Sequence, residues 1–260
     1  MVAQSRSIST RNGIVSTGRE PLICTPLVGR TEQAILAELA VVVGKRPDLI
    51  EWRADFFQGI GNTSAVLGVA EQLRTGASGT PIIFTIRSAH EGGEPLSLSP
   101  AQIAALDIAI CEERLVELID IEMSTDPVLL QLVRTAARDS STKLILSFHD
   151  FAKTPAENQL LTKFFQARDL GADIAKVAVT ANAREDVLTL LAATLKAHQA
   201  IELPLISMAM GHYGVLTRLF GSLYGSSVSF AAGHGSSAPG QLPIEDLNAV
   251  LAVLRRSLHG

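Results

Sequence analysis

The chain has 260 residues, of which 47% are hydrophobic and 18% charged, with a formal net charge of −4. That length fits one large α/β domain or two small ones. The weak acidity argues against a nucleic-acid or membrane-surface partner, because both favour basic patches, and no apolar run approaches the ~20 residues that span a membrane.

The first 20 residues are polar and lack the apolar centre of a signal peptide, so we expect a cytoplasmic protein. Within them, Asn12-Gly13 separates two short β-prone segments, which predicts a small β-hairpin. Cys24 and Cys111 lie far apart without CxxC spacing, so we expect neither a disulfide nor a zinc site.

Eight short apolar runs follow, and segments with helical spacing lie between them. The runs cover residues 21–27, 48–53, 81–87, 116–122, 143–149, 173–179, 204–210 and 226–232. Most are apolar throughout rather than alternating, which is typical of a parallel sheet covered on both faces. Asp126-Pro127 and Thr154-Pro155 are typical helix starts, with an N-cap residue before a proline.

Eight strand–helix units at intervals of about 30 residues predict a (β/α)8 TIM barrel. A doubly wound open sheet is the alternative, but it would carry a Gly-rich loop after the first strand, where this chain has VGRTEQ. We expect one barrel domain over residues 1–260, in which residues 1–20 form an N-terminal extension. The hairpin in this extension is expected to close the bottom of the barrel.

Active sites of such barrels lie at the carboxyl ends of the strands, and polar residues collect there in this sequence. They are Glu51, Arg53, Asp55, Arg87, Glu91, Glu94, Asp120, Glu122, His149, Asp150, Lys176 and Arg218, with the loop GSSAPGQ at 235–241. Clustered guanidinium groups repel one another, and the neighbouring acidic residues offset only part of their charge. The three arginines therefore predict a ligand that carries a carboxylate or a phosphate.

Met208 and Met210 share one face of their strand, where they either pack the barrel or line a pocket. The remaining histidines have no ligand spacing among them, so we predict no metal site, and nothing in the sequence calls for a cofactor.

Lys176 and His149 lie 27 residues apart, one strand–helix unit, so they belong to adjacent strands and can meet at the mouth of the barrel. The apolar neighbours of Lys176 in DIAKVAV, together with the nearby guanidinium groups, are expected to favour the uncharged amine. An uncharged lysine forms an imine with a carbonyl, and the imine acidifies the adjacent C–H. His149 is suited to remove that proton. The pair predicts Schiff-base chemistry on an anionic keto compound, by an aldolase or a dehydratase.

Seven motifs in order resemble the type I 3-dehydroquinate dehydratase family, over about residues 20–257. They are EWRAD (51–55), FTIRSAHEGGE (84–94), DIE (120–122), LILSFHD (144–150), AKVAV (175–179), SMAMGHYGVLTR (207–218) and SAPGQLP (237–243). The resemblance implies a hydro-lyase of the shikimate pathway that converts 3-dehydroquinate to 3-dehydroshikimate without a cofactor. It also suggests a homodimer.

The resemblance assigns three catalytic roles. Lys176 would form the imine with the C3 ketone, His149 would move the proton from C2 to the departing C1 hydroxyl, and Glu91 would orient His149. Substrate-binding roles would fall to Thr25, Glu51, Arg53, Arg87, Met208, Met210, Arg218, Phe230, Ser237 and Gln241.

The chain departs from the family pattern at Thr25, where a serine is expected, and at Phe148, where a polar residue is more common. Two alternatives stay open. One is another class I Schiff-base aldolase on the same fold, and the other is a non-catalytic barrel that binds a cyclic polyol carboxylate.

Overall fold

The computed structural model describes residues 7–16 and 21–259 and contains an eight-stranded parallel sheet closed into a barrel. The strands are β3 (Leu22–Leu27), β4 (Leu49–Arg53), β5 (Ile82–Thr85), β6 (Leu118–Glu122), β7 (Lys143–Asp150), β8 (Ile174–Thr180), β9 (Leu205–Met210) and β10 (Val228–Phe230). Their order is β10-β3-β4-β5-β6-β7-β8-β9. The ring is completed between β9 and the residues before β10, where the amide of Ser227 donates to the carbonyl oxygen of Leu205 at 2.6 Å. The predicted (β/α)8 barrel is confirmed.

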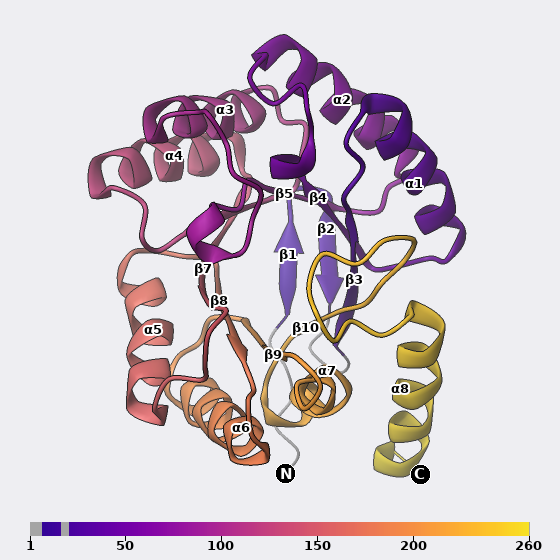
Figure 1. Ribbon diagram of the computed structural model, residues 1–260, viewed down its shortest axis with the longest axis vertical. Coiled ribbons are helices and arrows are strands. Elements are labelled where there is room, and N and C mark those ends of the chain that lie inside the picture. The colour runs from indigo at the N-terminus through magenta and orange to yellow at the C-terminus, as the bar shows by residue number, and fades with distance from the viewer. Residues whose placement is uncertain (1–6, 17–20, 260) are drawn as a thin grey trace.

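Helices surround the barrel on its outside (Figure 1). They are α1 (Glu32–Gly44), α2 (Thr63–Gly76), α3 (Pro100–Glu112), α4 (Pro127–Ser140), α5 (Glu157–Asp169), α6 (Arg184–Ala200), α7 (Val215–Phe220) and α8 (Ile244–His259). Asp126 caps α4 as predicted, since its side chain accepts from the amides of Val128 and Leu129. The helix predicted to begin at Thr154-Pro155 starts at Glu157 instead, because the hydroxyl of Thr154 donates to the carbonyl oxygen of Thr180 and holds the chain against β8.

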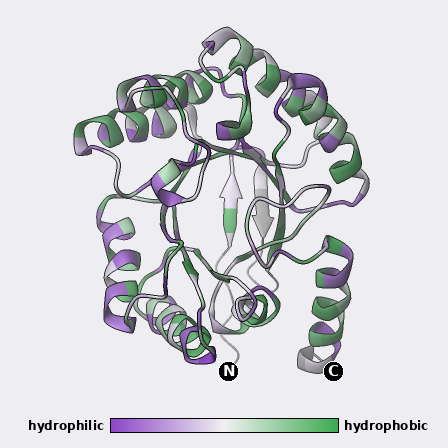
Figure 2. Cartoon of the chain, in the orientation of Figure 1, coloured by the Kyte–Doolittle hydropathy of each residue, from purple (hydrophilic) through white to green (hydrophobic). Residues whose placement is uncertain are grey.

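Side chains of the strands alternate between two apolar layers. The larger layer, which includes Trp52, Phe84 and Val177, lies between the sheet and the helices. The smaller layer fills the barrel interior and includes Ile83, Ile145 and Ile206. The strands are therefore mostly green in Figure 2, while the helices carry both colours. This burial on both faces explains why the strands were recognisable as continuous apolar runs.

The predicted hairpin consists of β1 (Ile8–Thr10) and β2 (Gly13–Ser16), paired antiparallel. Gly13 at the turn has a φ of +124°, a conformation that side-chain-bearing residues rarely adopt. Ile8 packs into the interior layer of the barrel, and the side chains of Arg11 and Asn12 bind Glu117 just before β6. The hairpin thus closes the amino-terminal mouth and leaves the carboxyl-terminal mouth for chemistry.

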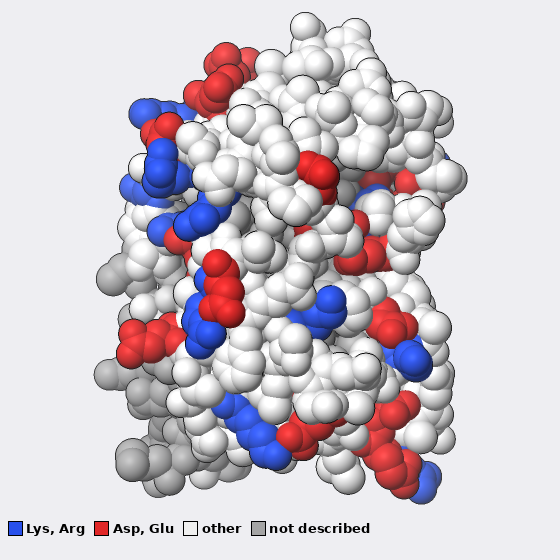
Figure 3. All heavy atoms as spheres, turned by 90° about the vertical axis from the view of Figure 1, so that its left-hand side faces the viewer, with Lys and Arg blue, Asp and Glu red and all other residues white. Residues whose placement is uncertain are grey.

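Charges are mixed on the outer surface. On the face shown in Figure 3, Lys, Arg, Asp and Glu side chains are interspersed, without an extended area of one sign. No helix within the described part of the chain is long and apolar enough to cross a membrane.

Candidate active site

A cavity lies where the carboxyl ends of the strands meet. All the residues to which the resemblance assigns a catalytic or substrate-binding role line it, apart from Thr25. The lining consists of Glu51, Arg53, Arg87, Glu91, His149, Phe151, Lys176, Ala178, Met208, Met210, Arg218, Phe230, Ser237, Ala238 and Gln241. Both methionines therefore face the cavity, which decides between the two interpretations left open by the sequence.

Lys176 lies on β8 with only 4% of its surface exposed. Its Nζ is 2.6 Å from Oδ2 of Asp120 and 3.6 Å from Oε1 of Glu51, and it lies 4.8 Å from the centre of the Phe230 ring. The expected apolar enclosure of the amine is therefore wrong in part, because two carboxylates lie beside the nitrogen.

Strand alternation explains the difference. Ala175, Val177 and Val179 point away from Lys176 into the layer under the helices, and only Ile174 and Ala178 share the barrel interior with it. Three of the five apolar neighbours in DIAKVAV thus do not face the amine. The carboxylates that do face it come from other strands, β4 and β6.

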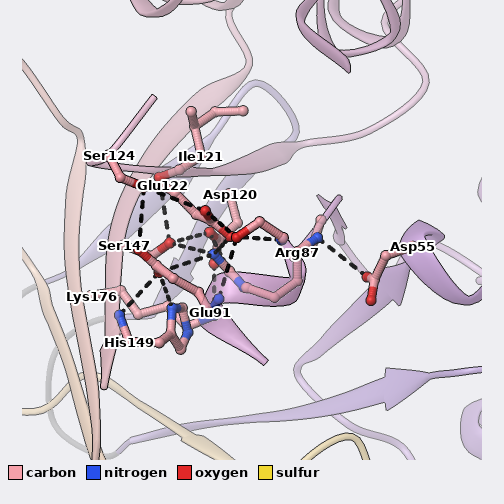
Figure 4. A network of polar contacts seen from close by, with 12 residues as sticks. Asp55, Arg87, Glu91, Asp120, Ile121, Glu122, Ser124, Ser147, His149 and Lys176 are labelled. Carbon is pink, nitrogen blue, oxygen red and sulfur yellow. Dashed lines mark hydrogen bonds and ion pairs between the residues drawn. The ribbon is translucent and has the colours of Figure 1, made fainter. Parts of the chain in front are cut away.

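Asp120 joins Lys176 to a buried polar network (Figure 4). Its Oδ1 accepts from Arg87 at 2.7 Å and from the hydroxyl of Ser147 at 2.6 Å. Arg87 also contacts Glu122 at 3.2 Å. Burial alone would raise the pKa of Asp120, but the charges of Arg87 and Lys176 outweigh it and hold that pKa far below the ordinary value. Asp120 is ionised at neutral pH.

His149 is held by Glu91. Oε2 of Glu91 accepts from the His149 backbone amide at 3.0 Å and lies 2.9 Å from Nδ1. Burial lowers the pKa of His149 well below its ordinary value, and the charges of Arg87 and Lys176 add to this. The imidazole is therefore uncharged, and with its hydrogen on Nδ1 toward Glu91, Nε2 is free to accept a proton.

The three predicted arginines differ in their partners. Arg53 forms two hydrogen bonds of 2.8 Å with Asp55, and Arg87 contacts Asp120, Glu122 and Glu91. Arg218 is 3% exposed and has no carboxylate within 4.0 Å among the described residues. It donates to the carbonyl oxygens of Phe230 and Pro239, and its Nε has no partner. Burial lowers its pKa to about 10, so the guanidinium stays charged.

The loop after β10 contributes Ser237 and Gln241 to the cavity. The side-chain oxygen of Gln241 accepts from the Ser237 amide at 3.0 Å, and its nitrogen donates to the Ser237 hydroxyl at 3.1 Å. These two residues, to which the family resemblance assigns substrate binding, are therefore hydrogen-bonded to each other in the loop whose Pro239 carbonyl oxygen accepts from Arg218.

Thr25 does not line the cavity. Its position on β3 alternates with Cys24, which faces the barrel interior, and it lies close to Gly233 beside Val42 of α1. The side chain is thus directed to the helix layer. Phe148 also points outward, where Lys163 lies 4.6 Å from its ring centre. The side chain of Phe148, where the chain departs from the family pattern, therefore does not line the cavity.

Sequence reasoning missed two residues at the site. Asp120 was noted as a strand-end acid but not as the partner of Lys176, which needs the cross-strand contacts. Phe151 lines the cavity with its ring 6.5 Å from that of His149. Its position two residues after His149 was the available signal. Within residues 7–16 and 21–259, no group of three or more His, Cys, Asp or Glu side chains could hold a metal ion.

Known proteins resemble this chain over its whole length. The family model described as Type I 3-dehydroquinase matches residues 23–257. The chain is 51% identical to the 3-dehydroquinate dehydratase of Aromatoleum aromaticum over 259 residues, which is 100% of both chains.

Two solved structures are also similar. The crystal structure of 3-dehydroquinate dehydratase from Geobacillus kaustophilus has a TM-score of 0.95 at 44% identity and 100% coverage of both chains. That of the type I enzyme from Clostridium difficile, with covalent modified comenic acid, has a TM-score of 0.92 at 36% identity, with 98% of this chain and 100% of that chain covered. The chain belongs to the type I 3-dehydroquinase family.

Proposed function

We propose that the protein removes water from 3-dehydroquinate to give 3-dehydroshikimate, as a hydro-lyase of the shikimate pathway. One observation carries the choice of substrate class: Arg218 is a buried cation that has no carboxylate partner among the described residues, and it lines the same cavity as the amine of Lys176. Leaving a buried guanidinium unpaired is costly, so the site favours a ligand carboxylate. A substrate with both a carboxylate and a ketone satisfies Arg218 and Lys176 together.

The contacts support a division of the catalytic roles. Lys176 forms a protonated imine with the ketone, which draws electrons from the adjacent carbon. His149, uncharged and with Nε2 free, takes the proton from that carbon and delivers it to the departing hydroxyl. Glu91 holds the hydrogen of His149 on Nδ1. Water then hydrolyses the imine and restores Lys176.

The remaining lining residues position the ring. Glu51, Arg53 and Arg87 present polar groups to the substrate hydroxyls, while Met208, Met210 and Phe230 enclose its carbon skeleton. Ser237 and Gln241 close over the carboxylate beside Arg218. These roles fit the placement of each side chain at the cavity wall.

Two further proposals concern the protein as a whole. A homodimer is proposed from the family resemblance alone. A cytoplasmic location is proposed because Cys24 and Cys111 are both buried free thiols, as in proteins of a reducing compartment.

Borohydride trapping tests the function. The protein is incubated with 3-dehydroquinate, reduced, digested and analysed by mass spectrometry. We expect an adduct on the peptide that contains Lys176 and none in Lys176→Ala. Binding of 3-dehydroquinate without any adduct or turnover would instead support the non-catalytic alternative.

His149→Ala separates imine formation from proton transfer. We expect this variant still to form the adduct but to turn over at least ~10² more slowly, the lower end of general acid–base effects. Turnover close to that of the parent protein would remove His149 from the proposed mechanism.

A further inference from the structure

We infer that Asp120 is the counter-ion of the reactive nitrogen throughout the reaction, first for the ammonium of Lys176 and then for the protonated imine. The inference rests on the proposed imine chemistry and assigns a catalytic role to a residue from a different strand, β6. The ion pair between Nζ of Lys176 and Oδ2 of Asp120, which are 2.6 Å apart, supports this role.

The carboxylate is fixed in place on its other side. Oδ1 accepts from the hydroxyl of Ser147 at 2.6 Å and from Arg87 at 2.7 Å, and the side chain of Asp120 is fully buried (Figure 4). Ser147 is the register partner of Lys176 across the β7–β8 pair. The pairing of these two strands therefore positions both the hydroxyl that holds Asp120 and the amine that Asp120 contacts. Two buried groups, Ser147 and Arg87, thereby orient the carboxylate so that Oδ2 faces Nζ.

Glu51 is the only other carboxylate that contacts Lys176 within the described residues, and it is less suited to this role. It lies 3.6 Å from Nζ, and the oxygen on that side already accepts from the hydroxyl of Thr85 at 3.0 Å. Its position at the cavity wall leaves it available to the substrate. Asp120 does not line the cavity, so it can serve the nitrogen without competing for the ligand.

Imine formation conserves the charge that Asp120 faces. Lys–NH3⁺ and a ketone give Lys–NH⁺=C and one water: the N–C bond forms, the C–O bond breaks, and two hydrogens leave nitrogen in the water. The positive charge is at the same nitrogen before and after. Once His149 has taken a proton from the ammonium, positive charge develops on nitrogen again as it attacks the ketone and as water leaves. A fixed carboxylate beside the nitrogen stabilises that developing charge without reorganisation.

Asp120 does not act as the base in this step. Its carboxylate is held ionised by Arg87 and Lys176, whereas His149 is uncharged and shares the cavity with Lys176. His149 takes one proton from nitrogen and gives it to the carbonyl oxygen, then repeats the transfer as the hydroxyl leaves as water. Proton transfer and charge stabilisation are thus divided between two residues.

Asp120→Asn keeps the volume and removes the charge. With 3-dehydroquinate in single-turnover experiments quenched by borohydride, we expect the adduct on Lys176 to form at least ~10² more slowly, as for loss of one preorganised stabilising group. KM should change less than about threefold, because Asp120 does not touch the ligand. Adduct formation at the parental rate would overturn the inference.

Two variants make the result specific. Glu117→Gln removes another buried, ion-paired carboxylate beside β6, at the opposite mouth of the barrel, and should form the adduct at the parental rate. Ser147→Ala leaves the charge of Asp120 but removes one of the hydrogen bonds that hold its carboxylate. We expect adduct formation to slow roughly three- to tenfold, the effect of one hydrogen bond. If Asp120→Asn does not fold, Ser147→Ala provides the test. Adduct formation at the parental rate in that variant would overturn the role of Asp120 as a fixed counter-ion.

The parent protein separates the two proposals. If it forms no adduct with 3-dehydroquinate, the proposed function itself fails. If the parent forms the adduct and Asp120→Asn does so equally fast, only the counter-ion assignment fails.

Discussion

Oε2 of Glu91 binds His149 twice, accepting from the backbone amide at 3.0 Å and contacting Nδ1 at 2.9 Å. One carboxylate oxygen thus fixes both the main chain and the ring of the proposed base. Burial raises the pKa of Glu91 to about 7, and the nearby charge of Glu122 adds to this despite the opposing charge of Arg87. The group that orients His149 therefore titrates in the physiological range.

The titration of Glu91 predicts a pH-dependent stability. Its pKa is higher in the folded protein, about 7, than the ordinary 4.5, so the folded state binds the proton more tightly. The stabilisation of the folded state by protonated Glu91 is fully present below pH 4.5 and is lost as pH rises through 7. Relative to the parent, the free energy of unfolding of Glu91→Gln should rise by up to about 3 kcal/mol between acidic and alkaline pH. Urea denaturation across that range measures it, and parallel profiles would contradict the assignment.

Turnover should respond in the opposite direction. Ionised Glu91 can only accept, which keeps the hydrogen of His149 on Nδ1 and leaves Nε2 free, whereas protonated Glu91 can donate to Nδ1. We expect kcat of the parent to fall as pH drops through about 7, the pKa of Glu91. The amide oxygen of Glu91→Gln accepts at every pH, so the fall in kcat near pH 7 should be absent from the pH profile of this variant.

The sequence predicted the position of the site better than its contacts. Strand ends and their spacing follow from apolar runs, so the meeting of Lys176 and His149 at one mouth could be anticipated. Which side chains face each other depends on alternation within each strand and on register between strands. Thr25 was expected in the site, but its side chain points to the opposite face of β3. The contact between Asp120 and Lys176 joins residues 56 apart along the chain. Local sequence pattern carries neither piece of information.

Arg218→Met should weaken substrate binding without destabilising the free protein. The guanidinium is buried, and its Nε has no hydrogen-bond partner in the part of the chain that the structure describes, so removing the group ends a desolvation cost. Truncating one partner of a buried charge pair with a ligand costs about 2–5 kcal/mol, so we expect KM to rise at least ~30-fold. Steady-state kinetics and urea denaturation measure the two effects.

Arg53→Met is the matched control for Arg218→Met. It leaves the carboxylate of Asp55, whose side chain is 0% exposed, without its two hydrogen bonds from Arg53. This variant should lose about 3–5 kcal/mol of stability, as when one partner of a buried ion pair is removed. Equal destabilisation by the two substitutions would show that Arg218 has a structural partner after all.

Gly92→Ala should disturb His149 through Phe151. A Cβ at Gly92 would lie 2.1 Å from the Phe151 ring, and that ring lies 6.5 Å from the His149 ring. Gly92 also has a φ of +84°, where a side chain costs about 1–2 kcal/mol. We expect kcat to fall roughly tenfold as the displaced ring disturbs the proposed base, which corresponds to about 1.4 kcal/mol.

Gly79→Ala isolates the contribution of the ring. Gly79 has a similar φ of +89°, but nothing lies within 4 Å of a Cβ there, so this variant should lose stability and keep its kcat. Adding Phe151→Ala to Gly92→Ala removes the clash, and the effects on kcat should then be non-additive. Additive losses would mean that Phe151 acts independently of Gly92.

Thr25→Val should stabilise the protein and leave turnover unchanged. The Thr25 hydroxyl is fully buried, has no hydrogen-bond partner among the described residues, and lies outside the cavity. Replacing it with a methyl group of similar shape removes an unsatisfied polar atom, worth about 1–3 kcal/mol. Thr85→Val is the same change at an equally buried strand position, but the Thr85 hydroxyl donates to Glu51 at 3.0 Å. It should lose both stability and activity, since it leaves Glu51 without that donor beside Lys176. A loss of turnover in Thr25→Val would instead return Thr25 to the site, as the family resemblance first suggested.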